Sequence, residues 1–399
     1  MIAAAAPARA YSPSLVVAVC FAIAALEGYD IQAVGVAAPA MGAALHLAKD
    51  QIGFAGSTGM IGLVIGAVVG GWLADRTGRK PVLVASAAWF GVFSLITALA
   101  VDANTLMLAR FATGLGFGGA MPNMIAIAVE ISPLSRRAAT VTTMFVGMPA
   151  GGALAALVTR FAPEAFDWRL IFIIGGLAPL AITPLAYWLL PETRPQHAPG
   201  ERRTLAALFG GGRTIGTLLL WVTFALTLIL LYLMLSWLPT LVIAKGLPRQ
   251  AGALAAVYFN VAAVAGGVTL GLIVDRHGFR WPLGAAYLGL AAAMAGLAVA
   301  DGIWPIMLLA SAAGFLVVGS LFSIYALAPS YYPAAVRGAG TGAAVGAGRI
   351  GSIVGPSIGG VLLAGGASGA QVVQSVVPMA VAAGVAVVAL TILAKPYAE

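Results

Sequence analysis

The chain has 399 residues, of which 61% are hydrophobic and only 9% are charged, and its mean hydropathy is +1.01. Soluble domains carry about 25% charged residues, so this composition excludes a water-soluble globular protein and indicates an integral membrane protein. The net charge of +8 is distributed between apolar stretches instead of forming one basic patch, which argues against nucleic-acid binding.

Twelve apolar stretches are bounded by charged residues, proline or glycine, and each is long enough to cross a bilayer as a helix of about 20 residues. The first six occupy approximately 15–40, 52–74, 82–101, 105–129, 139–158 and 170–190. After a polar stretch, the second six occupy approximately 215–244, 251–274, 283–300, 304–328, 338–363 and 372–393. We therefore expect an all-α integral membrane protein with twelve transmembrane helices.

The basic residues between these predicted spans are distributed unevenly over the two sides of the membrane. Fourteen Lys and Arg residues lie on the side of the N-terminus, and five lie on the opposite side. Loops rich in Lys and Arg stay in the cytoplasm, so this bias predicts that both termini are cytoplasmic. We expect the protein in the cytoplasmic (inner) membrane.

The second half of the chain repeats the first at an offset of 200 residues. Asp75 and Arg137, for example, recur as Asp275 and Arg337. Six spans followed by six more in the same orientation form a parallel repeat of the kind found in secondary transporters, with the substrate site between the halves. The predicted organisation is an N-terminal six-helix bundle at 1–190, a polar cytoplasmic linker at 191–214 that serves as a tether and orientation signal, and a C-terminal six-helix bundle at 215–399.

Three motifs resemble those of the major facilitator superfamily. Residues 71–80 (GWLADRTGRK) resemble its loop signature, 271–278 (GLIVDRHG) resemble the repeat of that signature, and 110–118 (RFATGLGFG) resemble its fourth-helix motif. The resemblance covers the whole chain and implies the major facilitator fold, with two six-helix bundles that open alternately to the two sides of the membrane.

The loop signatures suggest a gate. Asp75 and Asp275 each stand at a cytoplasmic helix end, where a carboxylate can face the positive end of a helix in the other half, near Gly338 or Ala138. Such contacts would hold the outward-open state, although the neighbouring arginines can equally serve as orientation anchors. The expected gating residues are Asp75, Arg76, Arg79, Asp275 and Arg276. The resemblance adds Arg337 and Glu130 to this set. For Glu130, a position at a solvated helix end is the simpler explanation.

Ionisable residues near the middle of a span are costly and mark functional sites. Glu27 and Asp30 lie about halfway along the first span, three residues apart and close to one helix face. Two carboxylates in a low-dielectric site cannot easily both stay ionised, so we expect at least one to carry a proton. The pair is a candidate for proton coupling, and the resemblance adds Arg110. A purely structural ion-pair network is the alternative.

Arg349 supplies the opposite charge, about eleven residues into the eleventh span. Its guanidinium stays charged and matches a carboxylate in geometry, so it requires an acidic partner. That partner is a substrate carboxylate, Glu27 or Asp30. A permanent bridge to Asp30 is the alternative to substrate binding, and the two contacts can be successive states of one cycle.

The first span also narrows the family. Glu27-Gly-Tyr-Asp30, followed by Gly35 and Pro39, resembles the signature of the aromatic acid:proton symporters, in which the first-helix acids and two arginines that match Arg337 and Arg349 are functional. Many members have Asp where this chain has Glu27. Residues 26–35 are most similar to the hydroxyphenylpropionate branch, which implies a phenylpropionate-type acid in preference to a benzoate.

An aromatic monocarboxylic acid needs a cation, apolar or aromatic walls, and a polar group for any ring hydroxyl. Aromatic residues in these spans can also be packing or lipid-facing residues, and Trp237 can be an anchor at the membrane surface. The expected substrate-binding residues are Arg349 and Asp30 for the charge, Tyr29, Tyr232, Trp237 and Tyr325 for the ring, and Gln32, Asn123 and Asn260 for a hydroxyl.

Two other functions remain open on the sequence alone: a drug or other organic solute:proton antiporter, and a membrane receptor for aromatic acids that transports nothing. The glycine pattern of 351–360 resembles a drug-antiporter motif but lies on the eleventh span instead of the fifth, so we interpret it as helix packing. An enzyme is not expected, because the chain has no Gly-Lys dipeptide and its three histidines lack metal-ligand spacing. We expect no catalytic residues, no metal, no cofactor beyond the proton as coupling ion, and a monomer whose partners are a small aromatic acid, protons and lipid.

Overall fold

The computed structural model describes residues 12–133, 137–162, 167–193, 206–210, 212–333 and 336–394. Twelve helices in this part of the chain are long and apolar enough to cross a membrane, which confirms the predicted all-α architecture. The first six are α1 (Pro13–Ala44), α2 (Lys49–Thr77), α3 (Arg79–Ala98), α4 (Ala103–Ile131), α5 (Arg137–Phe161) and α6 (Arg169–Leu189).

The second set of six follows the predicted linker. It consists of α8 (Thr214–Ile243), α9 (Arg249–His277), α10 (Arg280–Val299), α11 (Ile303–Leu327), α12 (Arg337–Ala364) and α13 (Gly369–Leu393), with the short helix α7 (Ala206–Phe209) before α8 and the 3₁₀ turn η2 (Ala328–Tyr331) after α11. Of the predicted linker, residues 194–205 and 211 lie outside the described residues.

The two sets of helices repeat one another at the predicted offset of 200 residues. The bounds of α9 are those of α2 shifted by 200, and each of these helices ends at a glycine with positive φ, 98° at Gly78 and 73° at Gly278. A positive φ is easily adopted by glycine, so these two residues let the chain turn sharply into the next helix. The repeat read from residue types is therefore also a repeat of backbone geometry.

Glycines bring helices together within each bundle at equivalent positions. A Cβ placed on Gly151 of α5 would lie 1.7 Å from the Ala25 carbonyl oxygen of α1, and one on Gly351 of α12 would lie 2.0 Å from the Ala225 oxygen of α8. Small residues allow this close approach between membrane helices. The glycines of 351–360 thus belong to a packing surface, as expected from the sequence.

Replacing Gly151 with alanine is expected to lower stability, because the new methyl group would force α5 away from the α1 backbone. Overpacking costs roughly 1–3 kcal/mol, which corresponds to a fall on the order of 5 °C in apparent Tm. Thermal unfolding in detergent measures this. Gly342→Ala on α12 is the matched control, because no atom lies within 4 Å of its added methyl group. Equal Tm values for the two variants would contradict the packing account.

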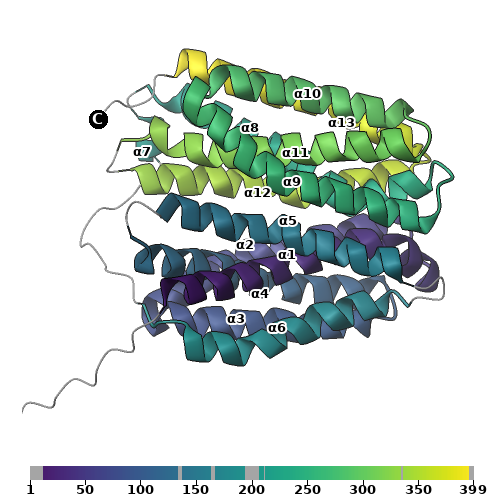
Figure 1. The fold of residues 1–399 in the computed structure, drawn as a ribbon, viewed down its shortest axis with the longest axis horizontal. Coiled ribbons are helices and arrows are strands. Elements are labelled where there is room, and N and C mark those ends of the chain that lie inside the picture. The colour runs from purple at the N-terminus through teal and green to yellow at the C-terminus, as the bar shows by residue number, and fades with distance from the viewer. Residues whose placement is uncertain are drawn as a thin grey trace, which may run out of the picture.

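The helices form two bundles that lie side by side (Figure 1). Helices α1 to α6 pack together as one bundle, and α8 to α13 as the other. Contact between the bundles is made mainly by α2 with α12, α5 with α9, and α1 with α8. A parallel repeat of two six-helix bundles is the predicted fold.

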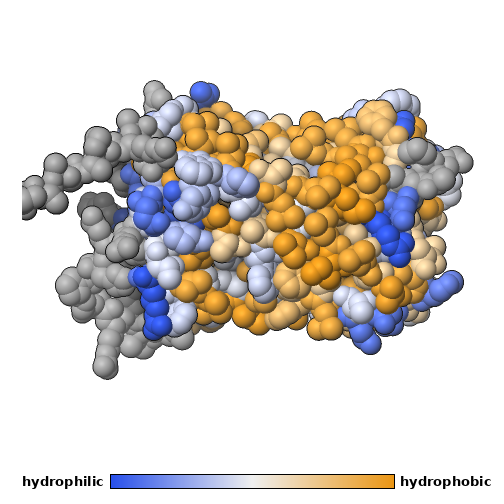
Figure 2. Space-filling model, turned by 90° about the horizontal axis from the view of Figure 1, so that it is seen from below, coloured by the Kyte–Doolittle hydropathy of each residue, from blue (hydrophilic) through white to orange (hydrophobic). Residues whose placement is uncertain are grey.

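The outer surface in the middle of the molecule is apolar. Figure 2 shows a broad hydrophobic band with hydrophilic residues toward both ends. Large side chains such as Val68, Leu108 and Trp304 are about 70% exposed. A soluble protein does not expose a band of this size, whereas a bilayer covers it, so the chain is a multi-pass membrane protein.

Polar contacts also join the bundles. The Ser57 hydroxyl on α2 lies 2.6 Å from that of Ser357 and donates to the Ile353 carbonyl oxygen on α12 at 2.5 Å. On α1, the Gln32 side chain donates to the Leu235 carbonyl oxygen of α8 at 3.0 Å. These contacts place α1 and α2 against α8 and α12 around the centre of the molecule.

Candidate functional site

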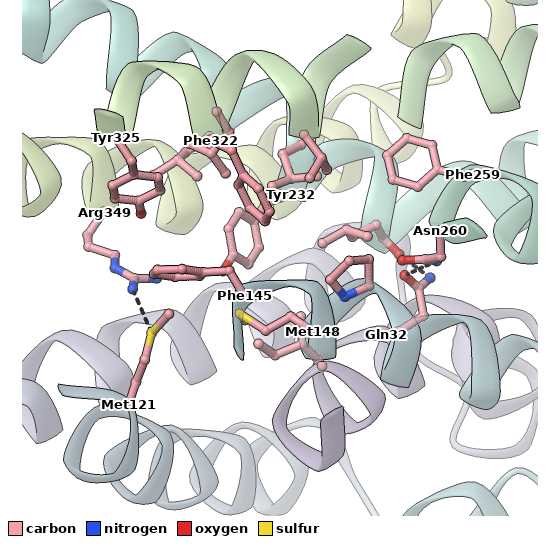
Figure 3. Close-up of a pocket in the computed structure, with 18 residues that line it drawn as sticks. Gln32, Met121, Phe145, Met148, Tyr232, Phe259, Asn260, Phe322, Tyr325 and Arg349 are labelled. Carbon is pink, nitrogen blue, oxygen red and sulfur yellow. Dashed lines mark hydrogen bonds between the residues drawn. The ribbon is translucent and has the colours of Figure 1, made fainter. Parts of the chain in front are cut away.

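A cavity of about 700 Å³, its open mouth included, lies between the two bundles. Helices from both bundles contribute to it, and most of its lining is apolar (Figure 3). Its lining includes Gly28, Ile31, Gln32, Met121, Phe145, Met148, Pro149, Leu228, Leu231, Tyr232, Leu235, Phe259, Asn260, Val318, Leu321, Phe322, Tyr325 and Arg349. Of the predicted substrate-binding residues, Gln32, Tyr232, Asn260, Tyr325 and Arg349 are therefore brought together.

Arg349 is the cation of this cavity. It extends from α12 toward Met121 of α4, and its Nη2 lies 3.5 Å from the Met121 sulfur (Figure 3). Its positive charge interacts electrostatically with the hydroxyl groups of Tyr232 and Tyr325 and with the carboxyl group of Glu27. No carboxylate within the described residues lies at salt-bridge distance from Arg349. A thioether is a weak acceptor, so the guanidinium is available for an anion that enters the cavity.

Glu27 is fully buried on α1 next to this cation. Both of its carboxylate oxygens lack a hydrogen-bond donor among the described residues. A buried carboxylate without hydrogen bonds is costly when charged, and only proton uptake or a nearby cation relieves that cost. Arg349 is the cation whose charge acts on Glu27, so the protonation of Glu27 and the occupancy of Arg349 are electrostatically linked.

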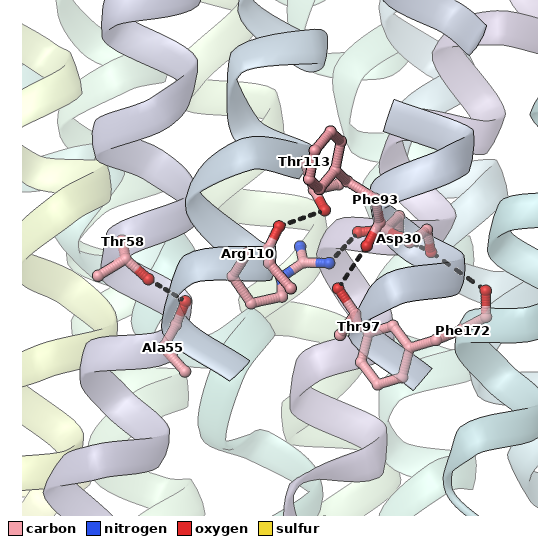
Figure 4. Close-up of polar contacts among 10 residues, drawn as sticks. Asp30, Ala55, Thr58, Phe93, Thr97, Arg110, Thr113 and Phe172 are labelled. Carbon is pink, nitrogen blue, oxygen red and sulfur yellow. Dashed lines mark hydrogen bonds and ion pairs between the residues drawn. The ribbon is translucent and has the colours of Figure 1, made fainter. Parts of the chain in front are cut away.

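Asp30 and Arg110 form a second charged cluster, inside the N-terminal bundle (Figure 4). Arg110 Nη1 of α4 lies 2.5 Å from one Asp30 carboxylate oxygen, and the Ser94 hydroxyl of α3 donates to the other at 2.5 Å. Asp30 is 0% exposed and Arg110 is 1% exposed. The guanidinium also lies over the Phe172 ring of α6, 5.7 Å from its centroid. One acidic side chain thus joins α1, α3 and α4.

This pairing corrects two predictions for Asp30. The permanent bridge to Arg349 is not formed, because Arg110 holds the carboxylate, and Asp30 does not line the cavity as a substrate-binding residue would. The cause is the direction of the side chain. Asp30 lies about 200° around α1 from Gly28, which does face the cavity.

Three more predicted binding residues do not line the cavity. The Tyr29 ring packs against Gly175 of α6, within 3.3 Å of where a Cβ on that glycine would lie. Asn123 donates to the Gly119 carbonyl oxygen of its own helix at 2.8 Å. Trp237 donates to the Pro356 carbonyl oxygen of α12 at 2.8 Å and is 1% exposed, so it is a packing residue between helices and not an anchor at the membrane surface.

The predicted gating residues lie at the helix ends on the side of the termini. Arg79 forms a salt bridge with Glu130, Arg76 stacks on Trp72 at 3.8 Å, and Arg337 Nε donates to the Tyr332 carbonyl oxygen at 3.4 Å. Glu130 is therefore more than a solvated helix end.

Asp75, Asp275 and Arg276 are exposed, and the two aspartates have no hydrogen bond or ion pair to described residues. The latch predicted for the outward-open state is not formed between Asp75 and α12. A Cβ on Gly71 of α2 or on Gly342 of α12 would meet no atom within 4 Å, so these faces of the two helices do not pack together. For the other latch, the side chain of Ala138 lies outside the described residues.

Sequence reasoning missed Ser94 and the phenylalanines of the cavity. Phe145 of α5 stacks on Tyr325 of α11 with ring centroids 5.5 Å apart, and it contacts Phe322 at 5.7 Å, so aromatic rings from both bundles meet at the cavity. Serine and phenylalanine are common in apolar spans, and nothing local distinguishes these residues from others that pack or face lipid.

A cavity between two six-helix bundles, with a cation facing it and a buried acid–arginine pair beside it, is the arrangement of a membrane transport protein. The sequence pattern of the Major Facilitator Superfamily matches residues 20–270. The chain belongs to this superfamily, as the loop signatures predicted.

Curated relatives agree with the narrower resemblance. The chain is 37% identical to the 3-(3-hydroxy-phenyl)propionate transporter of Escherichia coli K12, over 94% of this chain and 93% of that protein. It is 34% identical to the 4-hydroxybenzoate transporter PcaK of Pseudomonas aeruginosa, over 93% and 91% of the two chains. The predicted similarity to aromatic acid transporters is confirmed, and the chain is a transporter of small molecules, not an enzyme.

Solved structures agree with the fold. The D-xylose-proton symporter superposes with a TM-score of 0.77 at 18% identity, covering 96% of this chain and 98% of that chain. The nucleoside transporter NupG also gives 0.77, at 15% identity, covering 96% and 100%. At these identities the likeness establishes the major facilitator fold alone.

Proposed function

We propose that this transporter imports an aromatic carboxylic acid together with protons by alternating access, with a hydroxyphenylpropionate or a hydroxybenzoate as the cargo. It lies in the cytoplasmic membrane with both termini in the cytoplasm. The two bundles that form the cavity belong to the same chain, so a monomer suffices for this function. The proton is the coupling ion, and no other cofactor is needed.

The observation that carries the proposal is Arg349, a cation without a carboxylate partner among the described residues, in a cavity walled by aromatic rings. A guanidinium binds a carboxylate through charge-assisted hydrogen bonds, and rings favour stacked or edge contacts with a second ring. The curated relatives bear the names of hydroxylated aromatic acids, which agrees with this chemistry.

Proton coupling is assigned to Glu27, Asp30 and Arg110. When Asp30 gains a proton, its ion pair with Arg110 becomes a hydrogen bond between the still charged guanidinium and a neutral carboxylic acid, which weakens the contact between α1 and α4. When Glu27 gains a proton, Arg349 loses a competing anion and is better able to bind the substrate carboxylate. Both steps make inward movement of the acid depend on protons.

The two alternative functions fit the site less well. A cationic drug would be repelled by Arg349, the charge that faces the cavity, so a drug antiporter is disfavoured. A receptor that transports nothing needs no proton-dependent step, so the proton-coupling role proposed for the Asp30–Arg110 pair favours transport.

Uptake into proteoliposomes tests the proposal. With the interior more alkaline than the exterior, we expect labelled 3-(3-hydroxyphenyl)propionate or 4-hydroxybenzoate to accumulate well above its external concentration, because inward proton flow drives the acid. A protonophore should reduce accumulation to equilibration.

Protein-free liposomes correct for passive diffusion of the protonated acid, and a cationic dye serves as the competing cargo. Export of the dye without movement of either acid would establish the antiporter instead. Binding of an acid without accumulation would establish the receptor.

A further inference from the structure

Two amide side chains meet across the bundles at one end of the cavity. Asn260 Nδ2 of α9 lies 3.2 Å from Gln32 Oε1 of α1, and Gln32 in turn donates to the Leu235 carbonyl oxygen. Each amide is about 2% exposed, and both line the cavity. Figure 3 shows them at the end opposite Arg349. Their position suggests recognition of the part of the cargo farthest from its carboxylate.

The pair has hydrogen-bonding capacity left over. Asn260 donates its two N–H groups to the Gln32 Oε1 and to the Ala256 carbonyl oxygen. Gln32 donates one N–H group to the Leu235 carbonyl oxygen. One N–H of Gln32 and the Oδ1 of Asn260 then have no partner among the described residues. The Asn260 Oδ1 faces Gly152 of α5, where a Cβ would lie 2.7 Å from this oxygen, so the glycine leaves space beside it. A hydroxyl group both donates and accepts and can satisfy both atoms.

The register of α1 relates the two ends of the cavity to one helix. Two residues of α1, Glu27 and Gln32, are five positions apart, which is about 7.5 Å along a helix. Glu27 is the one that interacts electrostatically with Arg349. In a benzoate the para hydroxyl lies about 6 Å from the carboxylate carbon, and two more methylene groups add about 2.5 Å. A hydroxylated aromatic acid whose carboxylate faces Arg349 therefore directs its ring hydroxyl toward the amides at the opposite end of the cavity (Figure 3).

We propose that Gln32 and Asn260 form a subsite that recognises a ring hydroxyl and so selects hydroxylated aromatic acids over their unsubstituted analogues. This inference rests on the proposed function, in which Arg349 holds the carboxylate. An analogue without the hydroxyl displaces water from the amides and leaves their free N–H and oxygen unpaired. Its affinity should be lower by about 10-fold or more.

Competition for uptake tests the subsite. Unlabelled 3-(3-hydroxyphenyl)propionate and 3-phenylpropionate are compared by the concentration that halves uptake of the labelled hydroxylated acid. The wild-type protein should prefer the hydroxylated acid by about 10-fold or more. In Asn260→Ala and in Gln32→Leu this preference should fall to about 2-fold or less, because the hydroxylated acid loses affinity and the unsubstituted acid does not.

Ser57→Ala is the matched control, because Ser57 also joins the two bundles through a buried hydroxyl but does not line the cavity. Its preference should equal that of the wild type. If Asn260→Ala does not fold, Asn260→Ser is used instead. It replaces the amide with a hydroxyl group that can still donate and accept, so it should give an intermediate preference. An equal loss of affinity for both acids in these variants, or no preference in the wild type, would overturn the subsite. Failure of the wild type to bind either acid would instead overturn the proposed function.

Discussion

Replacing Asp30 with asparagine is expected to abolish accumulation of the acid against its gradient. The Asp30 carboxylate is fully buried and accepts hydrogen bonds from Arg110 and Ser94. An amide resembles the protonated acid in shape but cannot release a proton, so transport uncouples from the proton gradient. In proteoliposomes with an inward proton gradient, we expect the accumulation ratio to fall to about one. Exchange of internal for external acid requires no net proton movement and should persist.

The same substitution should also destabilise the protein, because Arg110 is 1% exposed and loses its only salt-bridge partner among the described residues. Loss of one member of a buried pair costs about 3–5 kcal/mol, which a lower apparent Tm would report. Asp167→Asn, which removes an exposed pair with Arg169, is the control and should change neither property. If exchange vanished together with accumulation, Asp30 would be a structural residue and not a coupling residue. Accumulation at the wild-type level would also rule out coupling.

Replacing Arg349 with glutamine is expected to weaken binding of aromatic carboxylates by on the order of 100-fold or more. The substrate carboxylate would remain in the cavity without its charged partner, and losses of about 2–5 kcal/mol are typical for such truncations. The affinity for the corresponding neutral amide of the acid should change little. Binding of the acid and of its amide to the purified protein, measured by calorimetry, separates the two effects.

Stability distinguishes this variant from Asp30→Asn. Arg349 has no salt bridge within the described residues, so its removal should leave the apparent Tm nearly unchanged. Arg280→Gln is the control, because Arg280 is exposed on α10 and does not line the cavity. Undiminished binding of the acid by Arg349→Gln would show that another group holds the carboxylate. A large fall in Tm would show that Arg349 holds helices together.

The sequence was sufficient to predict the helices, the repeat and the charged residues that lie within the bundles. These features depend on local hydropathy and on matching residues 200 positions apart, and both can be observed in a single sequence. Arg349 was placed in the cavity correctly because a lone cation within an apolar span has few sites that it can occupy. The Asp75 and Asp275 loops were also located correctly, although the Asp75 contact with α12 is not formed.

The partners of buried residues were harder to predict because they depend on how each helix is rotated. On α1, Gly28 and Gln32 face the cavity, whereas Asp30 points to α4. On α8, Tyr232 faces the cavity, and Trp237, five residues later and about 140° further around the helix, packs on α12. Hydropathy does not set this rotation when a helix is apolar on all sides. Packing against the neighbouring helices sets it.

The 200-residue repeat has a consequence for how such a protein acquires new cargo. Pro149 and Arg349 occupy equivalent positions in the two halves and both line the cavity, yet only one is charged. Asp30 likewise has the uncharged Leu230 as its counterpart. The scaffold is nearly symmetric, but its charges are not: the buried Asp30–Arg110 pair lies in one half and the guanidinium that faces the cavity lies in the other. We therefore expect that selectivity can evolve by point substitutions in the lining of the cavity without disturbing the buried Asp30–Arg110 pair or the shared glycine framework.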